Sequence, residues 1–209
     1  MSNVSTKPVI ILGAGGHAKV VADVLRLSGR TIIGVVDSNF KKETLCFGLC
    51  VLGADDTIEQ YKCDDVELVN GVGSLPGNND RLNLSQQMRT KGYKFATVIH
   101  PSAVVSESVK LNEGVQIMAS CVVQADTIIG LDTIINTGSL IDHDCKIEGN
   151  CHIAPGVTLC GGIHVGDGTH IGAGSVVLQN ITIGLNTVVA AGSVVYRNIE
   201  NDTIFIQSK

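Results

Sequence analysis

Apolar residues recur at a fixed spacing of six along the second half of the chain, from His100 to Val195. Divided into sixes from His100, this stretch gives sixteen units without an insertion, among them DHDCKI, EGNCHI and GDGTHI. The sixth place is Val, Ile or Leu in every unit, the fourth is small or β-branched, and the third is Gly, Asn, Asp or Ser. A fixed internal period of this kind predicts a repeat architecture.

The period also predicts which way each side chain points. Places four and six lie on the same side of a short strand, because side chains alternate along a strand. We expect them to form the interior, with place five pointing outward and a turn at place three, whose residues tolerate positive φ. Three such units close a triangular coil of about eighteen residues, so the stretch predicts about five stacked coils of parallel strands.

Half of the outward places carry aliphatic side chains. They are Val104, Val122, Ile128, Ile134, Leu140, Val176, Val188 and Val194. Flat faces that expose this many aliphatic side chains are typical of surfaces that another molecule covers. The pattern therefore favours a homo-oligomer.

The first hundred residues follow a different pattern, in which apolar runs alternate with helix-period segments. Residues 8–27 begin with an apolar run and a glycine turn, and continue with apolar positions on one face of a helix. Residues 31–39 and 66–73 read as strands, and 81–92 as a second helix. This alternation predicts a small parallel α/β layer. We therefore expect two domains, an α/β domain at 1–98 and a repeat domain at 99–209.

A glycine-rich loop follows the first predicted strand. Gly13, Gly15 and Ala18 fit the spacing G-x-G-x-x-G/A, and Asp37 ends the second predicted strand. In this dinucleotide fingerprint, backbone N–H groups at a helix N-terminus approach a pyrophosphate. A complete NAD domain needs more strands than fit before residue 100, so a nucleotide-linked sugar is the better candidate. A glycine-rich turn that binds nothing is the alternative.

Composition narrows the class of partner. The net charge of −5 argues against nucleic acid. We expect no membrane span, because no apolar run is long enough, and we see no signal peptide. Seven cysteines, an odd number, are typical of reduced thiols and predict a cytoplasmic protein. The pair Cys46 and Cys50 has no second pair at a suitable spacing, so we expect no metal.

The hexads resemble the hexapeptide-repeat acyltransferases, and GAGGHAKVVADVL resembles the start of the bacterial sugar acetyltransferases that join a small α/β domain to such a repeat. That group includes sialic acid O-acetyltransferases and N-acetyltransferases of nucleotide-linked 4-amino sugars. The resemblance implies a small Rossmann-like N-terminal domain followed by a left-handed parallel β-helix, a homotrimer with active sites between subunits, and acetyl-CoA as co-substrate. It also implies that Gly13, Gly15, Gly16, His17 and Asp37 hold the nucleotide end of the sugar.

His143 occupies place two of its hexad, where coil geometry requires no imidazole. Histidine titrates near neutrality and can take the proton that an acceptor loses in acetyl transfer. The resemblance makes His143 the general base, and a surface histidine is the alternative. Asp144 is either the residue that orients the ring or a turn residue at place three. By resemblance, Asn136 and His152 line the acceptor pocket.

For the CoA arm we expect contacts with the backbone at Gly161 and Gly162, with Arg197 as a further contact, between two subunits. The chain ends in YRNIENDTIFIQSK, without the Gly and Pro that are usual in the tail of the resembled family, so the holder of the adenine end stays open. We expect the remaining histidines of the repeat to have no catalytic role: His164 and His170 as exposed residues and His100 as a structural residue.

Three functions are open at this point. The first is acetyl-CoA-dependent N-acetylation of a UDP- or GDP-linked 4-amino-deoxy sugar for bacterial glycan or polysaccharide synthesis. The second is O-acetylation of sialic-acid-like sugars, and the third is a non-catalytic nucleotide-sugar-binding β-helix protein. We prefer the first, because free and CMP-linked sialic acids lack the pyrophosphate that GAGGH fits.

Overall fold

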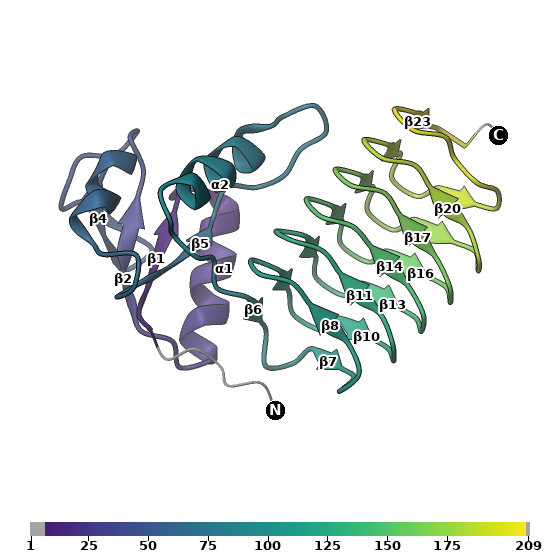
Figure 1. The fold of residues 1–209 in the computed structure, drawn as a ribbon, viewed down its shortest axis with the longest axis horizontal. Helices are drawn as coiled ribbons and strands as arrows, with labels where there is room; N and C mark the ends of the chain where they lie inside the picture. Colours follow the sequence, from purple (N-terminus) through teal and green to yellow (C-terminus); the bar gives the residue numbers. More distant parts are fainter. Residues whose placement is uncertain (1–6, 208–209) are drawn as a thin grey trace. The chain divides into compact units, whose positions relative to one another are not determined.

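The structure is a computed structural model that describes residues 7–207. It forms two compact units, which divide between Val98 and Ile99 (Figure 1). The fold class expected from the sequence, a small Rossmann-like α/β unit followed by a left-handed parallel β-helix, is confirmed.

The first unit is a sheet of five strands with the order β3-β4-β2-β1-β5. Its elements are β1 (Val9–Leu12), α1 (Gly16–Leu27), β2 (Ile32–Val36), β3 (Leu45–Cys46), β4 (Leu49–Gly53), the 3-10 helix η1 (Asp55–Gln60), β5 (Glu67–Asn70) and α2 (Asp80–Thr90). Strands β4, β2, β1 and β5 are parallel, and β3 forms an antiparallel hairpin with β4. The sheet is parallel as predicted, but β3, β4 and η1 are elements that the apolar pattern did not reveal.

Close packing of helix α1 on the sheet depends on one glycine. All four residues of β1 are buried, and α1 turns Ala18, Val21, Ala22, Val24 and Leu25 inward. A Cβ atom added to Gly71 would lie 2.8 Å from both the Cβ of Ala18 and the carbonyl oxygen of Leu12. Helix, first strand and the segment after β5 can therefore approach only because residue 71 has no side chain.

The second unit is a stack of triangular coils (Figure 1). The six-stranded face contains β7 (Val104–Val105), β10 (Val122–Val123), β13 (Leu140–Ile141), β16 (Thr158–Leu159), β19 (Val176–Val177) and β22 (Val194–Val195). The five-stranded face contains β8 (Lys110–Leu111), β11 (Ile128–Ile129), β14 (Lys146–Ile147), β17 (His164–Val165) and β20 (Thr182–Ile183). The seven-stranded face contains β6 (Val98–Ile99), β9 (Gln116–Ile117), β12 (Ile134–Ile135), β15 (His152–Ile153), β18 (His170–Ile171), β21 (Val188–Val189) and β23 (Ile204–Phe205).

The turns lie where the hexads predict them. Place three has positive φ in every hexad after the first two: in Gly114, Ser120, Asp126, Asp132, Gly138, Asp144, Asn150, Gly156, Gly162, Gly168, Gly174, Asn180, Asn186 and Gly192. Glycine and short polar residues tolerate this conformation best. The strands of successive coils pair in parallel, as Leu140 pairs with Val122 and Thr158. The register from β7 to β22 therefore follows from the hexads, whereas β23 departs from it and pairs Ile204 with Val188.

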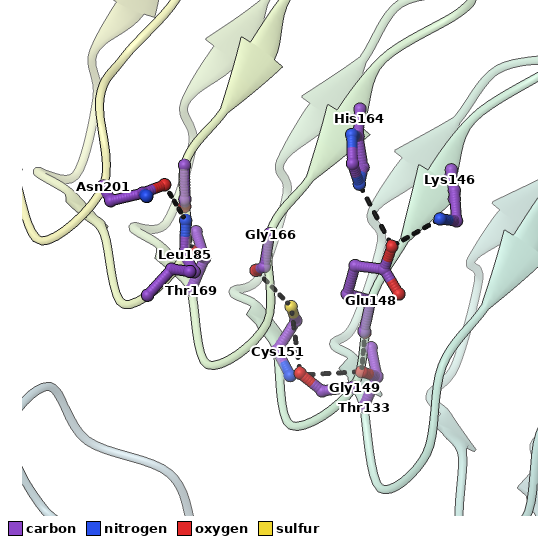
Figure 2. Close-up of polar contacts among 11 residues, drawn as sticks. Thr133, Lys146, Glu148, Gly149, Cys151, His164, Gly166, Thr169, Leu185 and Asn201 are labelled. Carbon is purple, nitrogen blue, oxygen red and sulfur yellow. Dashed lines mark hydrogen bonds and ion pairs between the residues drawn. The ribbon is translucent and has the colours of Figure 1, made fainter.

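The interior is apolar at place six and mixed at place four. At place four, hydroxyl groups donate to the carbonyl oxygen fifteen residues further on, at 2.7–3.0 Å, from Thr127, Thr133, Ser139, Thr169 and Ser175. The thiols of Cys145 and Cys151 do the same at 3.2 Å. Figure 2 shows Cys151 between Gly166 and Thr133. These side chains satisfy buried carbonyl groups at the start of the turns in the next coil.

The outward places differ in exposure: seven of the sixteen are exposed, seven are half-buried, and Gln116 and Ile134 are buried. Val104 is 63% exposed and Leu140 is 45% exposed on the six-stranded face. On the seven-stranded face, however, Ile134 is only 1% exposed, and His170 is half-buried. The expectation that these two are exposed was wrong, because the period fixes direction but not what lies against a face. In residues 7–207 no helix is long and apolar enough to cross a membrane.

Candidate functional site

His143 lies in the turn between β13 and β14, where the six-stranded and five-stranded faces meet. We call the turns at 142–144, 160–162 and 178–180 the His143 corner, because they stack at this edge in successive coils. A hollow of about 440 Å³ opens there, lined by residues of all three turns. The coil gives His143 a fixed place without burying it, and its side chain is 60% exposed.

Two carboxylates contact His143, one at the imidazole and one at the backbone. Nδ1 of His143 lies 2.7 Å from Oδ2 of Asp144, and the backbone N–H of His143 donates to Oδ1 of Asp142 at 2.9 Å. The hydrogen bond that Nδ1–H donates to Asp144, followed by the negative charge of Asp142, raises the pKa of His143 above its ordinary value. With Nδ1–H directed at Asp144, Nε2 is the nitrogen that can accept a proton. Asp144 also has φ 59°, so the turn role and the orienting role coexist in one residue.

A second, smaller hollow adjoins the first. It has about 270 Å³ and lies on the six-stranded face against apolar side chains, including Val122, Leu140 and Leu159. Asp142 and Cys160 border both hollows. The polar corner therefore continues into an apolar groove, a combination that suits a ligand with a reactive polar end and an apolar arm.

The predicted CoA contacts are only partly brought together. Gly161 and Gly162 line the polar hollow directly. Arg197 occupies the same corner two coils further on, but it does not line either hollow. Its guanidinium group lies 5.9 Å from the ring centre of Tyr196. Gln179 and Asn180 complete the wall beyond the glycines, and no sequence motif points to either of them.

His152 and Asn136 contact each other, as a shared pocket requires. The side-chain oxygen of Asn136 accepts the N–H of Thr137 at 2.8 Å, which turns its amide nitrogen toward Nε2 of His152 at 3.1 Å. An amide nitrogen can only donate, so in this contact Nε2 of His152 is the acceptor.

His170, expected to be exposed, packs edge-to-face on His152 with 4.7 Å between ring centres. Burial lowers the pKa of His170, and its Nδ1 has no hydrogen-bond partner among the described residues. The signal that could have revealed this contact is the spacing: His152 and His170 are paired neighbours in adjacent coils.

His143 and His152 lie on different sides of the β-helix. The first is at the corner between two faces, and the second is in β15 on the third face. Nine residues separate them, which is half of the eighteen-residue coil defined by pairs such as Val122 and Leu140. Within one chain, the two imidazoles therefore point away from each other.

The glycine loop of the first unit follows β1 and precedes α1. Gly13 needs its φ of +92°, whereas a Cβ atom on Gly15 or Gly16 would meet no heavy atom within 4 Å. Gly15 is the N-cap residue and offers no side-chain hydrogen bond. Oδ2 of Asp37 accepts the N–H of Ala14 at 2.9 Å and so closes the loop. The outer surface of the loop is open at Gly15 and Gly16. Neither close packing nor a positive φ explains why these two positions carry glycine.

The carboxyl ends of the strands carry further groups. His17 is half-buried in the first turn of α1, with Cβ 3.7 Å from the position of an added Cβ on Gly73. Asp55, at the start of η1, was not selected from the sequence. Burial and then the nearby charge of Asp37 raise the pKa of Asp55. Ligands of parallel sheets bind at this edge.

No group of three or more potential metal ligands occurs in the described part of the chain. Cys46 and Cys50 lie in the hairpin of β3 and β4, where Cys46 pairs with Leu49 and Cys50 with Leu45. The hairpin accounts for their spacing.

Two family models match the sequence: the PglD N-terminal domain over residues 8–88 and the bacterial transferase hexapeptide (six repeats) over residues 144–179. No curated protein sequence matches the chain. Among solved structures, PerB from Caulobacter crescentus in complex with CoA and GDP-perosamine is 38% identical, with a TM-score of 0.85, over 96% of this chain and 94% of that chain.

Two further solved structures match nearly the whole of this chain. The acetyltransferase domain of PglB from Neisseria gonorrhoeae, in complex with acetyl coenzyme A, is 29% identical with a TM-score of 0.87, over 95% of this chain and 96% of that one. WeeI from Acinetobacter baumannii shares the fold at 24% identity and a TM-score of 0.83, over 95% and 96%. Together with the hexads and the glycine loop, these matches show that the chain belongs to the hexapeptide-repeat sugar acetyltransferases with a PglD-type N-terminal domain.

Proposed function

We propose that the protein transfers the acetyl group of acetyl-CoA to the amino group of a nucleotide-linked amino-deoxy sugar, with His143 as general base. The observation that carries the proposal is the hydrogen bond between Nδ1 of His143 and Asp144 at the edge of an open hollow. Two relatives support the reaction class: PerB was solved with CoA and GDP-perosamine, and the PglB domain with acetyl coenzyme A. Perosamine N-acetyltransferase was also solved with one histidine replaced by asparagine or by alanine.

In the proposed reaction, the neutral amine of the sugar attacks the thioester carbonyl. Nε2 of His143 accepts the proton that the nitrogen loses as the amide bond forms. The imidazolium, stabilised by Asp144, then gives this proton to the departing sulfur of CoA, so that the ring returns to its neutral form. Because the pKa of His143 is raised, we expect the rate to rise with pH through a midpoint above the ordinary value of about 6.5.

A backbone N–H has to stabilise the negative charge that develops on the thioester oxygen. The N–H of Gly162 already donates to the carbonyl of His143 at 2.9 Å. We therefore assign the N–H of Gly161 to this role, since it lines the same hollow. The apolar groove beside β13 and β16 is the place that we assign to the CoA arm. Arg197, further along the corner, is the candidate for a phosphate group.

We assign the nucleotide end of the sugar to the loop of the first unit. The uncapped N-terminus of α1 offers N–H groups and a favourable dipole to a pyrophosphate. Gly15 and Gly16 leave the surface open there, while Asp37 and Asp55 suit hydroxyl groups of the ribose or donors of the base. Alanine at Gly15 keeps the backbone conformation, so we expect it to raise KM for the nucleotide sugar and to leave kcat unchanged. An unchanged KM would contradict this assignment.

Asn136 and His152 can join His143 in one site only if two copies of the chain share it, because their face and the His143 corner point in different directions. We propose a homotrimer in which each site takes His143 from one subunit and His152 from the next. Co-expressed His143→Ala and His152→Ala subunits should then regain about a quarter of wild-type activity by random assortment in a cyclic trimer. If the mixture is no more active than either parent, the site lies within one chain.

A thiol-release assay tests the reaction itself. Acetyl-CoA is offered with UDP- and GDP-linked 4-amino sugars, and with free and CMP-linked sialic acids. We expect CoA release only with a nucleotide-linked amino sugar, a product that resists mild base as an amide does, and loss of turnover in folded His143→Ala. A base-labile ester on a sialic acid would instead favour O-acetylation. The proposed setting is bacterial polysaccharide synthesis in the cytoplasm, where seven unpaired thiols would stay reduced.

A further inference from the structure

Gly161 is a glycine that the fold itself does not require. It occupies place two, and its φ lies outside the left-handed region, unlike that of Gly162 beside it. At the same corner, the neighbouring coils carry side chains at place two, including Ala125 and Gln179. The backbone would therefore accept alanine at position 161.

The imidazole of His143 occupies the space that a side chain on Gly161 would need. A Cβ atom added to Gly161 would lie 2.7 Å from Cε1, 2.9 Å from Nε2 and 3.3 Å from Nδ1 of His143. Distances below 3.0 Å are not tolerated between a Cβ and a ring atom, so the ring would have to move. The ring therefore lies over the backbone of the next coil, and three of its atoms lie close to the position that the Cβ of an alanine at 161 would occupy.

We propose that Gly161 is a positioning residue for His143: its missing side chain forms the seat on which the imidazole rests while Nδ1 meets Asp144. The inference rests on the proposed role of His143 as base. The hydrogen bond of 2.7 Å to Asp144 requires one orientation of the ring, and crowding from below would rotate the ring away from it. The coil holds the backbone of Asp144 at φ 59°, so its carboxylate could follow a displaced ring only by side-chain rotation. This role is separate from a contact with CoA, since alanine retains the N–H at position 161.

Gly149 offers a matched control in the same β-helix. It is also a place-two glycine outside the left-handed region, and an added Cβ would lie 2.8 Å from Oδ1 of Asp167. It belongs to the turn between β14 and β15, so the crowded side chain is a carboxylate at a different corner. Gly149→Ala and Gly161→Ala therefore impose similar changes on the backbone, but only the second crowds an imidazole.

The test combines ¹⁵N NMR of the imidazole with kinetics. In the wild type we expect the His143 ring to keep its proton on Nδ1 in the neutral form and to titrate above about 6.5. In Gly161→Ala we expect the titration midpoint to move to lower pH and the tautomer preference to be lost. We also expect kcat to fall about 10- to 100-fold, as small displacements of a catalytic group do, with KM for acetyl-CoA within about twofold. Gly149→Ala should match the wild type in every readout.

Unchanged titration and tautomer of His143 in Gly161→Ala would overturn the proposal, whatever the activity. If Gly161→Ala does not fold, the test is made on the wild-type protein. The Hα atoms of Gly161 should give nuclear Overhauser effects to Hε1 of His143. Their absence would refute the proposed contact between the imidazole and Gly161. The NMR readouts need no turnover. A fully active His143→Ala would therefore reject the proposed base while leaving this test of the ring position intact.

Discussion

Thr133 connects two coils through one hydroxyl group, and replacing it by valine tests how the interior of the β-helix is held together. Its Oγ1 donates to the carbonyl of Glu148 at 2.8 Å and accepts the N–H of Cys151 at 3.1 Å. Figure 2 shows this contact beside Cys151. Thr133 is fully buried. Valine has nearly the same shape, and Val157 already occupies the corresponding place-four position elsewhere, so the substitution removes hydrogen bonding without creating a cavity.

The magnitude follows from the two groups left unpaired. A buried polar group without its partner destabilises the native state by about 1–3 kcal/mol, so the two groups left unpaired in Thr133→Val should together lower the free energy of unfolding by about 2–6 kcal/mol. Thr127 provides the comparison, because it contributes one such bond, to the carbonyl of Asp142 at 3.0 Å. For Thr127→Val, which leaves one group unpaired, we expect a loss of about 1–3 kcal/mol. Thr133→Ser keeps the hydroxyl and loses one methyl group, at a cost of about 1 kcal/mol.

Urea unfolding followed by far-UV circular dichroism measures these differences, since the chain has no Trp to report by fluorescence. All variants have to be compared at one protein concentration, because subunit association would contribute to the apparent stability. The expected order of destabilisation is Thr133→Val, then Thr127→Val. If Thr133→Val loses no more stability than Thr127→Val, the second hydrogen bond, to Cys151, adds nothing and the reasoning fails.

Three further predictions concern the site and its surroundings. Asp144→Asn removes the main cause of the raised pKa of His143, so the acid limb of the pH–rate profile should move to lower pH while the maximal rate falls; an unmoved limb would separate Asp144 from the base. Burial lowers the pKa of His170, so acid favours the unfolded state once pH falls below about 6.5, and His170→Phe should lose less stability than the wild type between pH 7 and 5.5 in calorimetry. Cys160 borders both hollows, so acetyl-CoA should slow its alkylation, whereas Cys151, whose pKa burial raises to about 12, should not react in the native protein with or without acetyl-CoA.

The repeat is predictable from the sequence because each place in the hexad has one physical task. A branched side chain at place six fills the interior, and a residue that tolerates positive φ at place three makes the turn, as Asp144 and Gly162 do. The pairing of His143 with Asp144 follows from the same register, since the turn brings adjacent side chains together at 2.7 Å. Counting half a coil between His143 and His152 also gives their opposite directions.

The hexad predicts the direction in which a side chain points, but it could not predict whether that side chain is buried. Ile134 and His170 have outward places, yet one is buried and the other half-buried, because burial depends on what covers a face. The hairpin of β3 and β4 was missed because its apolar run is short and interrupted by Gly48, so that its cysteines drew attention as possible ligands. Asp55 was missed because its raised pKa arises from burial and from Asp37, which is distant in sequence.

Neither the packing of the interior nor the positive φ of the turn constrains the residue at place two. Along the edge of the β-helix that contains the His143 corner, place two holds Glu107, Ala125, His143, Gly161, Gln179 and Arg197, which share no chemical property. The residues before place two are held instead by hydrogen bonds from place-four side chains. The hydroxyl of Thr127 donates to the carbonyl of Asp142, and the thiol of Cys145 donates to the carbonyl of Cys160. Catalytic groups can therefore change at place two while the coil stays intact. A loss of activity on substitution there measures chemistry, whereas the same loss at place four or six measures folding.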